Sequence, residues 1–155
     1  LLTIPQTAPS TGVDTTAAAS DIAAAAPYDT GDDSLYSRLG GLYGISAAVD
    51  NLVDRLYVNQ FGNANPKVAE FHEQQGHAGF KFLVTAWSIQ ETGGPAIYRG
   101  RDMRASHAHL NVTAREFDMV RTEIKTSLYQ LNVPEREFDE FMAIIDSYED
   151  MVVGG

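Results

Sequence analysis

The sequence predicts an all-α fold in a single domain. Along four segments, apolar residues recur at steps of three and four, which is the spacing of the buried face of an amphipathic helix. No strand-period segment and no internal repeat stands out between them. A chain of 155 residues is long enough for one domain with a hydrophobic core and too short for two.

Composition excludes several classes of partner. The formal charge of -10 argues against nucleic acid and anionic membranes, because their phosphates would be repelled. No apolar run approaches the roughly 20 residues that cross a bilayer, so no integral membrane segment is expected. The absence of cysteine rules out disulfides and thiolate metal sites. A metal would therefore need histidine, carboxylate or an organic cofactor.

Residues 1–33 are predicted to form a disordered acidic tail, and residues 34–155 the folded domain. The tail is rich in alanine, threonine and serine, contains five aspartates and has no lysine or arginine. Such a segment buries too little apolar surface to offset its ordering entropy. The start at Leu1 fits removal of an export signal, and a trimmed start explains it equally well. We expect a soluble protein, either exported (periplasmic or secreted) or cytoplasmic.

The domain is expected to begin with a short helix that Ser34 caps and that ends before Gly40-Gly41. An amphipathic helix follows over residues 45–57. Its apolar positions are Ile45, Val49, Leu52, Val53, Leu56 and Tyr57.

Residues 59–66 are predicted to be a loop, residues 67–71 a short turn and residues 74–76 a break. A second amphipathic helix is expected over residues 78–91, with apolar positions Phe80, Leu83, Val84, Trp87 and Ile89.

Two further helices close the domain. Thr113 and Glu116 have the Thr-x-x-Glu form of a capping box, which predicts a helix start for residues 113–131. Pro134 suits the first turn of a last helix that runs to about Val152. Their apolar positions include Phe117, Val120, Ile124, Leu128, Phe138, Phe141, Ile144 and Ile145.

The segment between the second and third long helices presents one histidine. Gly93-Gly94-Pro95 must end a helix, since glycine tolerates positive φ and proline cannot continue the hydrogen-bond ladder. A short helical piece then ends at His107. A histidine held between two longer helices can direct one ring nitrogen into a cavity, although a solvated histidine at a helix end fits the pattern as well. His109, two residues on, would face elsewhere on a helix, and a two-ligand metal site would be poor.

In order and spacing, these motifs resemble those of the truncated haemoglobins, and most closely the exported bacterial forms of group I. The first glycine and the histidine lie fourteen residues apart, and the likeness covers Ser34 to about Val153. The residues that carry it are Ser34 to Gly41, Gly93-Gly94-Pro95, Tyr98-Arg99-Gly100, Met103 to His107, and Val133-Pro134.

The resemblance implies a two-over-two helical sandwich around haem b, with His107 as the proximal ligand of the iron. For the apolar positions the alternative is ordinary core packing, and for Tyr98 and Arg101, which would meet the haem propionates, it is a solvated loop. The expected pocket residues are Val53, Phe71, His72, Phe80, Leu83, Val84, Trp87, Tyr98, Arg101, Met103, Val112, Phe117, Val120 and Ile144.

The distal side departs from the family pattern. Val53 falls where many members place a tyrosine that hydrogen-bonds bound oxygen, and Val84 falls where glutamine is common. His72 stands in place of a phenylalanine, although a slip of one residue would give that role to Phe71. A pocket without donors would hold oxygen loosely. Three alternatives stay open: His72, His77 or Lys81 as a sixth ligand, Tyr57 as the donor, or His72 as the donor.

The resemblance further implies reversible binding of dioxygen, nitric oxide and carbon monoxide, in oxygen binding, transport or sensing. Nitric oxide dioxygenation would be an enzymatic role and would need an external reductase. Two other classes are weighed beside this: a haem protein with two protein ligands, for electron transfer or redox sensing, and a globin-fold interaction module without haem.

Overall fold

The structure is a computed structural model that describes residues 31–154, so most of the predicted tail lies outside the described residues. In this part of the chain no helix has the length and hydrophobicity to cross a membrane. Its helices are α2 (Leu35–Arg38), α3 (Gly41–Val58), α4 (Gln60–Asn63), α5 (Pro66–Gln74), α6 (His77–Glu91), α7 (Met103–His107), α8 (Ala114–Gln130), α9 (Glu135–Ser147) and α10 (Glu149–Val152).

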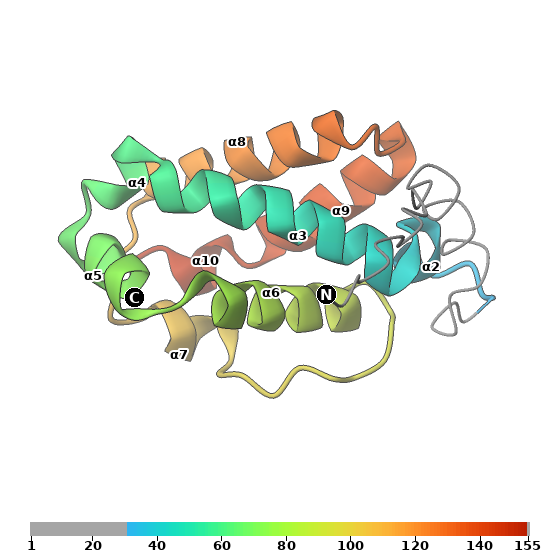
Figure 1. The fold of residues 1–155 in the computed structure, drawn as a ribbon, viewed down its shortest axis with the longest axis horizontal. Helices are drawn as coiled ribbons and strands as arrows, with labels where there is room; N and C mark the ends of the chain where they lie inside the picture. Colours follow the sequence, from blue (N-terminus) through green and yellow to red (C-terminus); the bar gives the residue numbers. More distant parts are fainter. Residues whose placement is uncertain (1–30, 155) are drawn as a thin grey trace, which may run out of the picture.

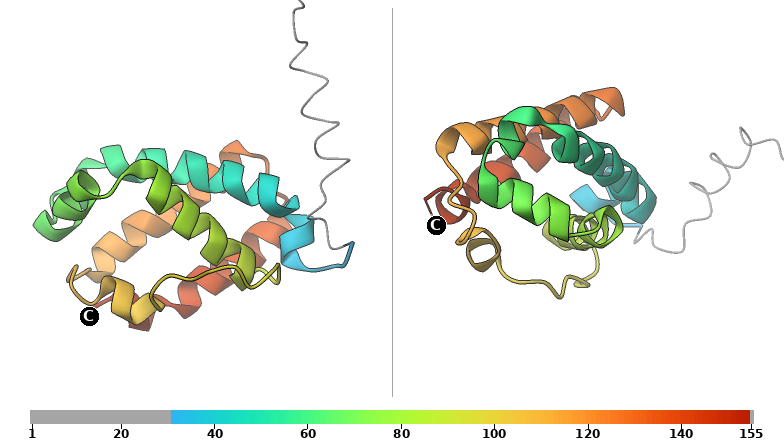
Figure 2. Two further views of the ribbon diagram at one scale, coloured as in Figure 1. Left: turned by 60° about the horizontal axis from the view of Figure 1, so that its bottom comes forward. Right: turned by 60° about the vertical axis from the view of Figure 1, so that its left-hand side comes forward.

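The four long helices form two antiparallel pairs, one laid over the other (Figure 1). Helix α3 packs against α6, α8 packs against α9, and α3 crosses onto α8. The short α7 packs on α10 and lies at the same end of the molecule as α4 and α5 (Figure 1), and its golden ribbon can be followed in both views of Figure 2. This arrangement is the predicted all-α, two-over-two sandwich.

Three clusters of buried side chains hold the pairs together. The first joins α2, α3 and α6 through Tyr36, Ile45, Val49, Val53 and Ile89. The second joins α8 and α9 through Ile124, Leu128, Phe138 and Met142. The third lies beneath α7 and consists of Val112, Phe117 and Val152. Each fully buried aliphatic or aromatic side chain contributes about 1.5–3 kcal/mol.

The segment between α3 and α6 is more helical than predicted. The expected loop contains α4, because the Asn59 side chain accepts a hydrogen bond from the Gly62 amide at 3.0 Å and caps that helix. The expected turn is the longer helix α5, which Asn65 caps by accepting from the Lys67 amide at 3.0 Å. The predicted capping box at Thr113 is present, and the last predicted helix is divided at Tyr148 into α9 and α10.

Arg38 connects α2 to α9. Its Nη1 donates to Glu137 Oε1 at 2.5 Å and to Glu140 Oε1 at 3.1 Å, and its Nη2 donates to Glu140 Oε2. The hydrogen bonds that Arg38 donates to these carboxylates raise the pKa of Arg38. The hydrogen bond from Arg38 in turn holds the pKa of Glu140 below its ordinary value of 4.5. This contact links α2 to α9 and requires the glutamates to be ionised.

Replacing Arg38 with methionine is expected to lower the thermal midpoint at pH 7 and to lower it less in acid. Because the pKa of Glu140 is depressed in the folded state, the pair stabilises the fold above pH 4.5 and loses that effect as the pH falls through the lower folded value. Thermal melts from pH 7 downward test this. Lys67→Met is the control, since Lys67 and Glu70 form an exposed pair at 3.7 Å. A deficit that does not change with pH would show that Arg38 acts by packing.

Candidate functional site

His107 is held in one tautomer by its own helix. It is the last residue of α7 and is half-buried. Its Nδ1 lies 2.8 Å from the carbonyl oxygen of Met103, one turn back. A carbonyl can only accept, so Nδ1 carries the proton and donates it. The neutral ring therefore has its lone pair on Nε2, which is the arrangement of a metal-binding histidine with a second-shell acceptor.

The environment of His107 also favours the neutral ring. Burial lowers its pKa below the ordinary 6.5, the hydrogen bond to Met103 opposes that shift, and the charge of His109 adds to it. His109 itself is exposed. At neutral pH the side chain is therefore ready to offer a lone pair.

The side chains packed next to α7 are apolar, and the residues that follow α10 pack against them. Three predicted pocket residues meet there: Val112 and Phe117 are buried in the third cluster, and Met103 packs against it. Val112 forms a parallel bridge with Val153, and its carbonyl accepts from the Gly154 amide at 3.0 Å. Asp102 caps the start of α7 by accepting from the Ala105 amide at 2.8 Å. These contacts fix a helix of only five residues.

Helix α6 supplies apolar side chains at helical spacing. Phe80 and Val84 are half-buried against the first cluster, and Leu83 is 42% exposed. Trp87 is half-buried and meets the Tyr148 ring edge-on, with centroids 5.4 Å apart. On α8 and α9, the predicted residues Val120 and Ile144 are half-buried, and Val120 packs on the second cluster.

Val53, the predicted distal residue, and Tyr57 lie one turn apart on α3. Val53 is fully enclosed in the first cluster, with none of its surface exposed. Tyr57, one turn further along α3, lies against Phe80, with ring centroids 6.0 Å apart. Its hydroxyl donates to the carbonyl of Gln75 at 3.2 Å. The phenol at the open end of α3 is thus Tyr57, because Val53 faces the closed centre of the α3–α6 interface.

Val53→Tyr is therefore expected to destabilise the fold by overpacking, by about 1–3 kcal/mol. Val58→Tyr is the matched control, since Val58 is on the same helix and is 76% exposed. Urea unfolding monitored by circular dichroism gives both values. Equal stability of the two variants would mean that space for a ring exists at position 53.

Two histidines flank Tyr57. His72 stacks on its ring at 4.1 Å between centroids, and His77 lies at 3.8 Å. The Nδ1 of His72 is 2.7 Å from Asn63 Oδ1, and burial followed by the charge of His77 lowers the pKa of His72. Phe71 instead meets Phe80 edge-on at 5.3 Å. Phe71 and His72 thus contact different aromatic rings, those of Phe80 and Tyr57 respectively.

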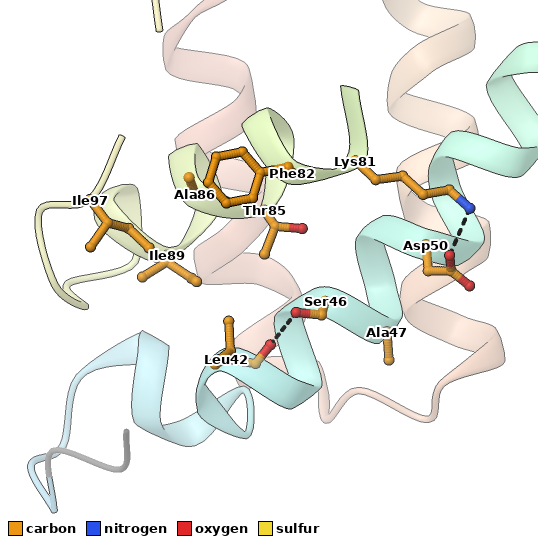
Figure 3. A pocket seen from close by; sticks show the side chains of 10 residues that line it. All are labelled: Leu42, Ser46, Ala47, Asp50, Lys81, Phe82, Thr85, Ala86, Ile89 and Ile97. Atoms are coloured by element: carbon orange, nitrogen blue, oxygen red, sulfur yellow. Dashed lines mark hydrogen bonds and ion pairs between the residues drawn. The ribbon is translucent and has the colours of Figure 1, made fainter. Parts of the chain in front are cut away.

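Lys81 of α6 forms ion pairs with two aspartates of α3. Its Nζ lies 2.7 Å from Asp50 Oδ1 and 2.6 Å from Asp54 Oδ1. Figure 3 shows it at the edge of a shallow groove of about 510 Å³ on the outer surface of the α3–α6 pair. Of the predicted pocket residues, none lines this groove. In this conformation, Lys81 is not aimed at the predicted site.

The connector before α7 is held by its own polar groups. The Tyr98 hydroxyl donates to the Arg101 carbonyl at 2.7 Å, and burial raises the pKa of Tyr98. Arg99 donates to the carbonyls of Ala96 at 3.1 Å and Tyr98 at 3.0 Å. The Arg101 side chain is exposed and available to an anion.

The donor set fits haem better than a bare metal ion. Within residues 31–154, no group of three or more histidine, aspartate or glutamate side chains is placed to hold a metal. One neutral imidazole with apolar surroundings is instead what an axial haem ligand requires.

Comparisons with known proteins agree with this geometry. Residues 34–153 match the bacterial-like globin family. The chain is 29% identical over 146 residues to the group 1 truncated hemoglobin LI410 of Chlamydomonas moewusii, covering 90% of this chain and 79% of that protein. The structure of Chlamydomonas reinhardtii THB1 matches with a TM-score of 0.60 and 31% identity, over 79% of this chain and 98% of that one.

The truncated hemoglobin of Tetrahymena pyriformis, in its Fe(III) form, has a TM-score of 0.67 at 22% identity, over 79% of this chain and 100% of that one. That likeness shows the fold. Together, the family match over nearly all of the described residues and the similarity to THB1 place the sequence: the chain belongs to the bacterial-like globin family, the two-over-two truncated haemoglobins.

Proposed function

We propose that this protein binds haem b through His107 and reversibly binds a diatomic gas on the opposite face of the haem. The observation that carries the proposal is the hydrogen bond from His107 Nδ1 to the carbonyl of Met103, which leaves the lone pair on Nε2, on a helix whose Met103 packs against the apolar third cluster. A related structure, the 2/2 hemoglobin from Synechococcus sp. PCC 7002, is described as having covalently attached heme. Haem would supply the iron that dioxygen, nitric oxide or carbon monoxide binds.

The remaining pocket residues would act by shape and polarity. Phe80, Val84 and Trp87 would exclude water from the distal face, since they present apolar surface at helical spacing. Met103, Val112 and Phe117 would support the proximal side. Arg101, with Tyr98 bonded to its carbonyl, would pair with a propionate.

Tyr57 is the residue that we assign as donor to the bound gas. Burial raises its pKa, so the phenol keeps its proton at neutral pH. Its bond to Gln75 is 3.2 Å long and lies at an exposed position, so the hydroxyl can exchange that partner at small cost. A donor at this place would slow the release of bound oxygen, which suits a role in oxygen binding or sensing. Nitric oxide dioxygenation would use the same geometry and an external reductase.

A second candidate is a haem protein with two protein ligands. The observation in its favour is the pair of imidazoles, His72 and His77, in contact with the Tyr57 ring. Burial and mutual charge keep His72 neutral, as a ligand must be. A shift of either ring toward the iron would give a six-coordinate centre suited to electron transfer.

Absorption spectra of the purified, haem-loaded protein in ferric, ferrous and carbonyl states separate these functions. A five-coordinate ferrous spectrum that changes on adding carbon monoxide supports gas binding. A low-spin six-coordinate ferrous spectrum without added ligand supports the second candidate. Failure to bind stoichiometric haem would overturn both and leave a globin-fold interaction module.

A further inference from the structure

Trp87, Tyr148 and Glu91 form a continuous contact between α6 and the corner where α9 meets α10. The Trp87 and Tyr148 rings meet edge-on at 5.4 Å and 68°. The Tyr148 hydroxyl donates to Glu91 Oε2 at 2.6 Å. The three side chains are all half-buried, so each has contacts with the protein interior and some exposure to solvent.

The position of this trio connects the pocket to the surface. Trp87 lies three residues after Val84 and seven after Phe80, so it shares their face of α6. Tyr148 lies at the junction of α9 and α10, and α10 is the helix on which α7 packs. An oxidising equivalent that leaves the pocket side through Trp87 therefore reaches Tyr148 next, and the electron moves in the opposite direction, from Tyr148 to Trp87.

The chemistry of the trio matches a proton-coupled electron step. Oxidised tryptophan is a strong one-electron acceptor, and a phenol in van der Waals contact is a suitable donor. The phenol gives up an electron readily only if its proton leaves at the same time. The hydrogen bond to Glu91, with burial, raises the pKa of Tyr148 to about 12, so the proton stays on the phenol at rest. A carboxylate 2.6 Å away is placed to accept it.

We propose that Trp87, Tyr148 and Glu91 form a one-electron relay that carries oxidising equivalents from the haem pocket to the protein surface. An electron passes from Tyr148 to oxidised Trp87, while the Tyr148 proton moves to Glu91 Oε2. The products are neutral Trp87, a tyrosyl radical and protonated Glu91. The relay rests on the proposed haem function only for its oxidant, which is hydrogen peroxide reacting at ferric haem.

The electron balance closes with that oxidant. Hydrogen peroxide takes two electrons and two protons to give two molecules of water. One electron comes from the haem iron and the other from Trp87, which Tyr148 then refills. Two equivalents of an enediol reductant of the ascorbate type, each giving one electron and one proton, close the balance. One reduces the Tyr148 radical, to which Glu91 returns the proton, and the other would restore the electron taken from the haem iron. The relay would thus couple the consumption of peroxide to a reductant that reacts at the protein surface.

The first experiment does not require haem. Trp87 is the only tryptophan in the chain, so azide radicals generated by pulse radiolysis produce one defined tryptophan radical. In the full-length protein, the tryptophan radical should decay while a tyrosyl radical grows in at the same rate. Tyr148→Phe keeps the ring contact and removes the hydroxyl, and should abolish the coupled growth. Glu91→Gln should slow the transfer by about tenfold or more, which corresponds to about 1.4 kcal/mol of barrier.

The control is Tyr129→Phe, because Tyr129 is 66% exposed on α8 and packs on Phe138 at 4.8 Å between centroids. This variant should transfer like the parent protein. Unchanged kinetics in Tyr148→Phe would overturn the relay, as would equal effects of Tyr148→Phe and Tyr129→Phe. A purely structural tie between α6 and α10 would change thermal stability in both trio variants without changing radical transfer.

The second experiment adds peroxide to the haem-loaded ferric protein and records electron paramagnetic resonance spectra after freezing. A tyrosyl signal that disappears in Tyr148→Phe supports the route from the haem. Coupled transfer after azide oxidation, with no such signal after peroxide, would overturn the connection to the haem and keep the Trp87–Tyr148 step. Failure of haem loading would count against the proposed function alone, since the radiolysis result is independent of it.

Discussion

Replacing His107 with alanine is expected to abolish stable haem binding. The His107 ring is held through Nδ1 by the Met103 carbonyl, which leaves the lone pair on Nε2, and Met103 itself packs against the apolar third cluster. Alanine would remove the axial bond and leave only apolar contacts, which retain haem weakly and leave the iron to exogenous ligands. The spectrum of the reconstituted variant should lack the five-coordinate ferrous form and respond to added imidazole.

His109→Ala is the matched control, since His109 is exposed and two residues away. It should bind haem as the parent protein does. Circular dichroism of both variants checks that α7 and the neighbouring helices remain. An unchanged five-coordinate ferrous spectrum in His107→Ala would show that the axial ligand is another residue.

Replacing Tyr57 with phenylalanine is expected to speed the release of oxygen by roughly tenfold to a hundredfold. A hydrogen bond to a partly charged acceptor contributes about 1.5–3 kcal/mol, and each ~1.4 kcal/mol is tenfold in an equilibrium constant. Among related sites such differences appear mainly in dissociation rates. Carbon monoxide is less polarised when bound, so its release should change less. Stopped-flow kinetics on the ferrous protein measure both.

Tyr43→Phe serves as the comparison, because Tyr43 is on the same helix and is 49% exposed. It should leave oxygen release unchanged. If Tyr57→Phe also leaves oxygen release unchanged, the donor is another group, and His72 is the next to test. A rate plateau in ligand binding to the parent protein would instead indicate an internal sixth ligand.

The long helices were predictable because their signals are local. Apolar residues at helical spacing, the Thr113–Glu116 capping box and the Gly93-Gly94-Pro95 stop each act within a few residues. The short helices α4 and α5 were not predicted, since their starts depend on Asn59 and Asn65 side chains bonding to backbone amides. Asparagine is common in loops as well, so the sequence alone does not distinguish the two uses.

The placement of the site residues was less predictable than the fold. Val53 and Tyr57 lie four residues apart on one face of α3, so periodicity treats them alike. What separates them is their depth in the first cluster: Val53 is one of its buried members, whereas Tyr57 packs against its edge and also contacts His72 and His77. The contact between Tyr148 and Glu91 joins residues 57 positions apart, and no local pattern marks it.

The hydrogen bond from the Gly154 amide to the Val112 carbonyl gives the proximal side its own reporter. Val112 belongs to the apolar third cluster, so this amide exchanges with solvent only when that cluster loosens. Hydrogen–deuterium exchange at Gly154 would therefore read out how tightly the short helix is held, without any signal from haem.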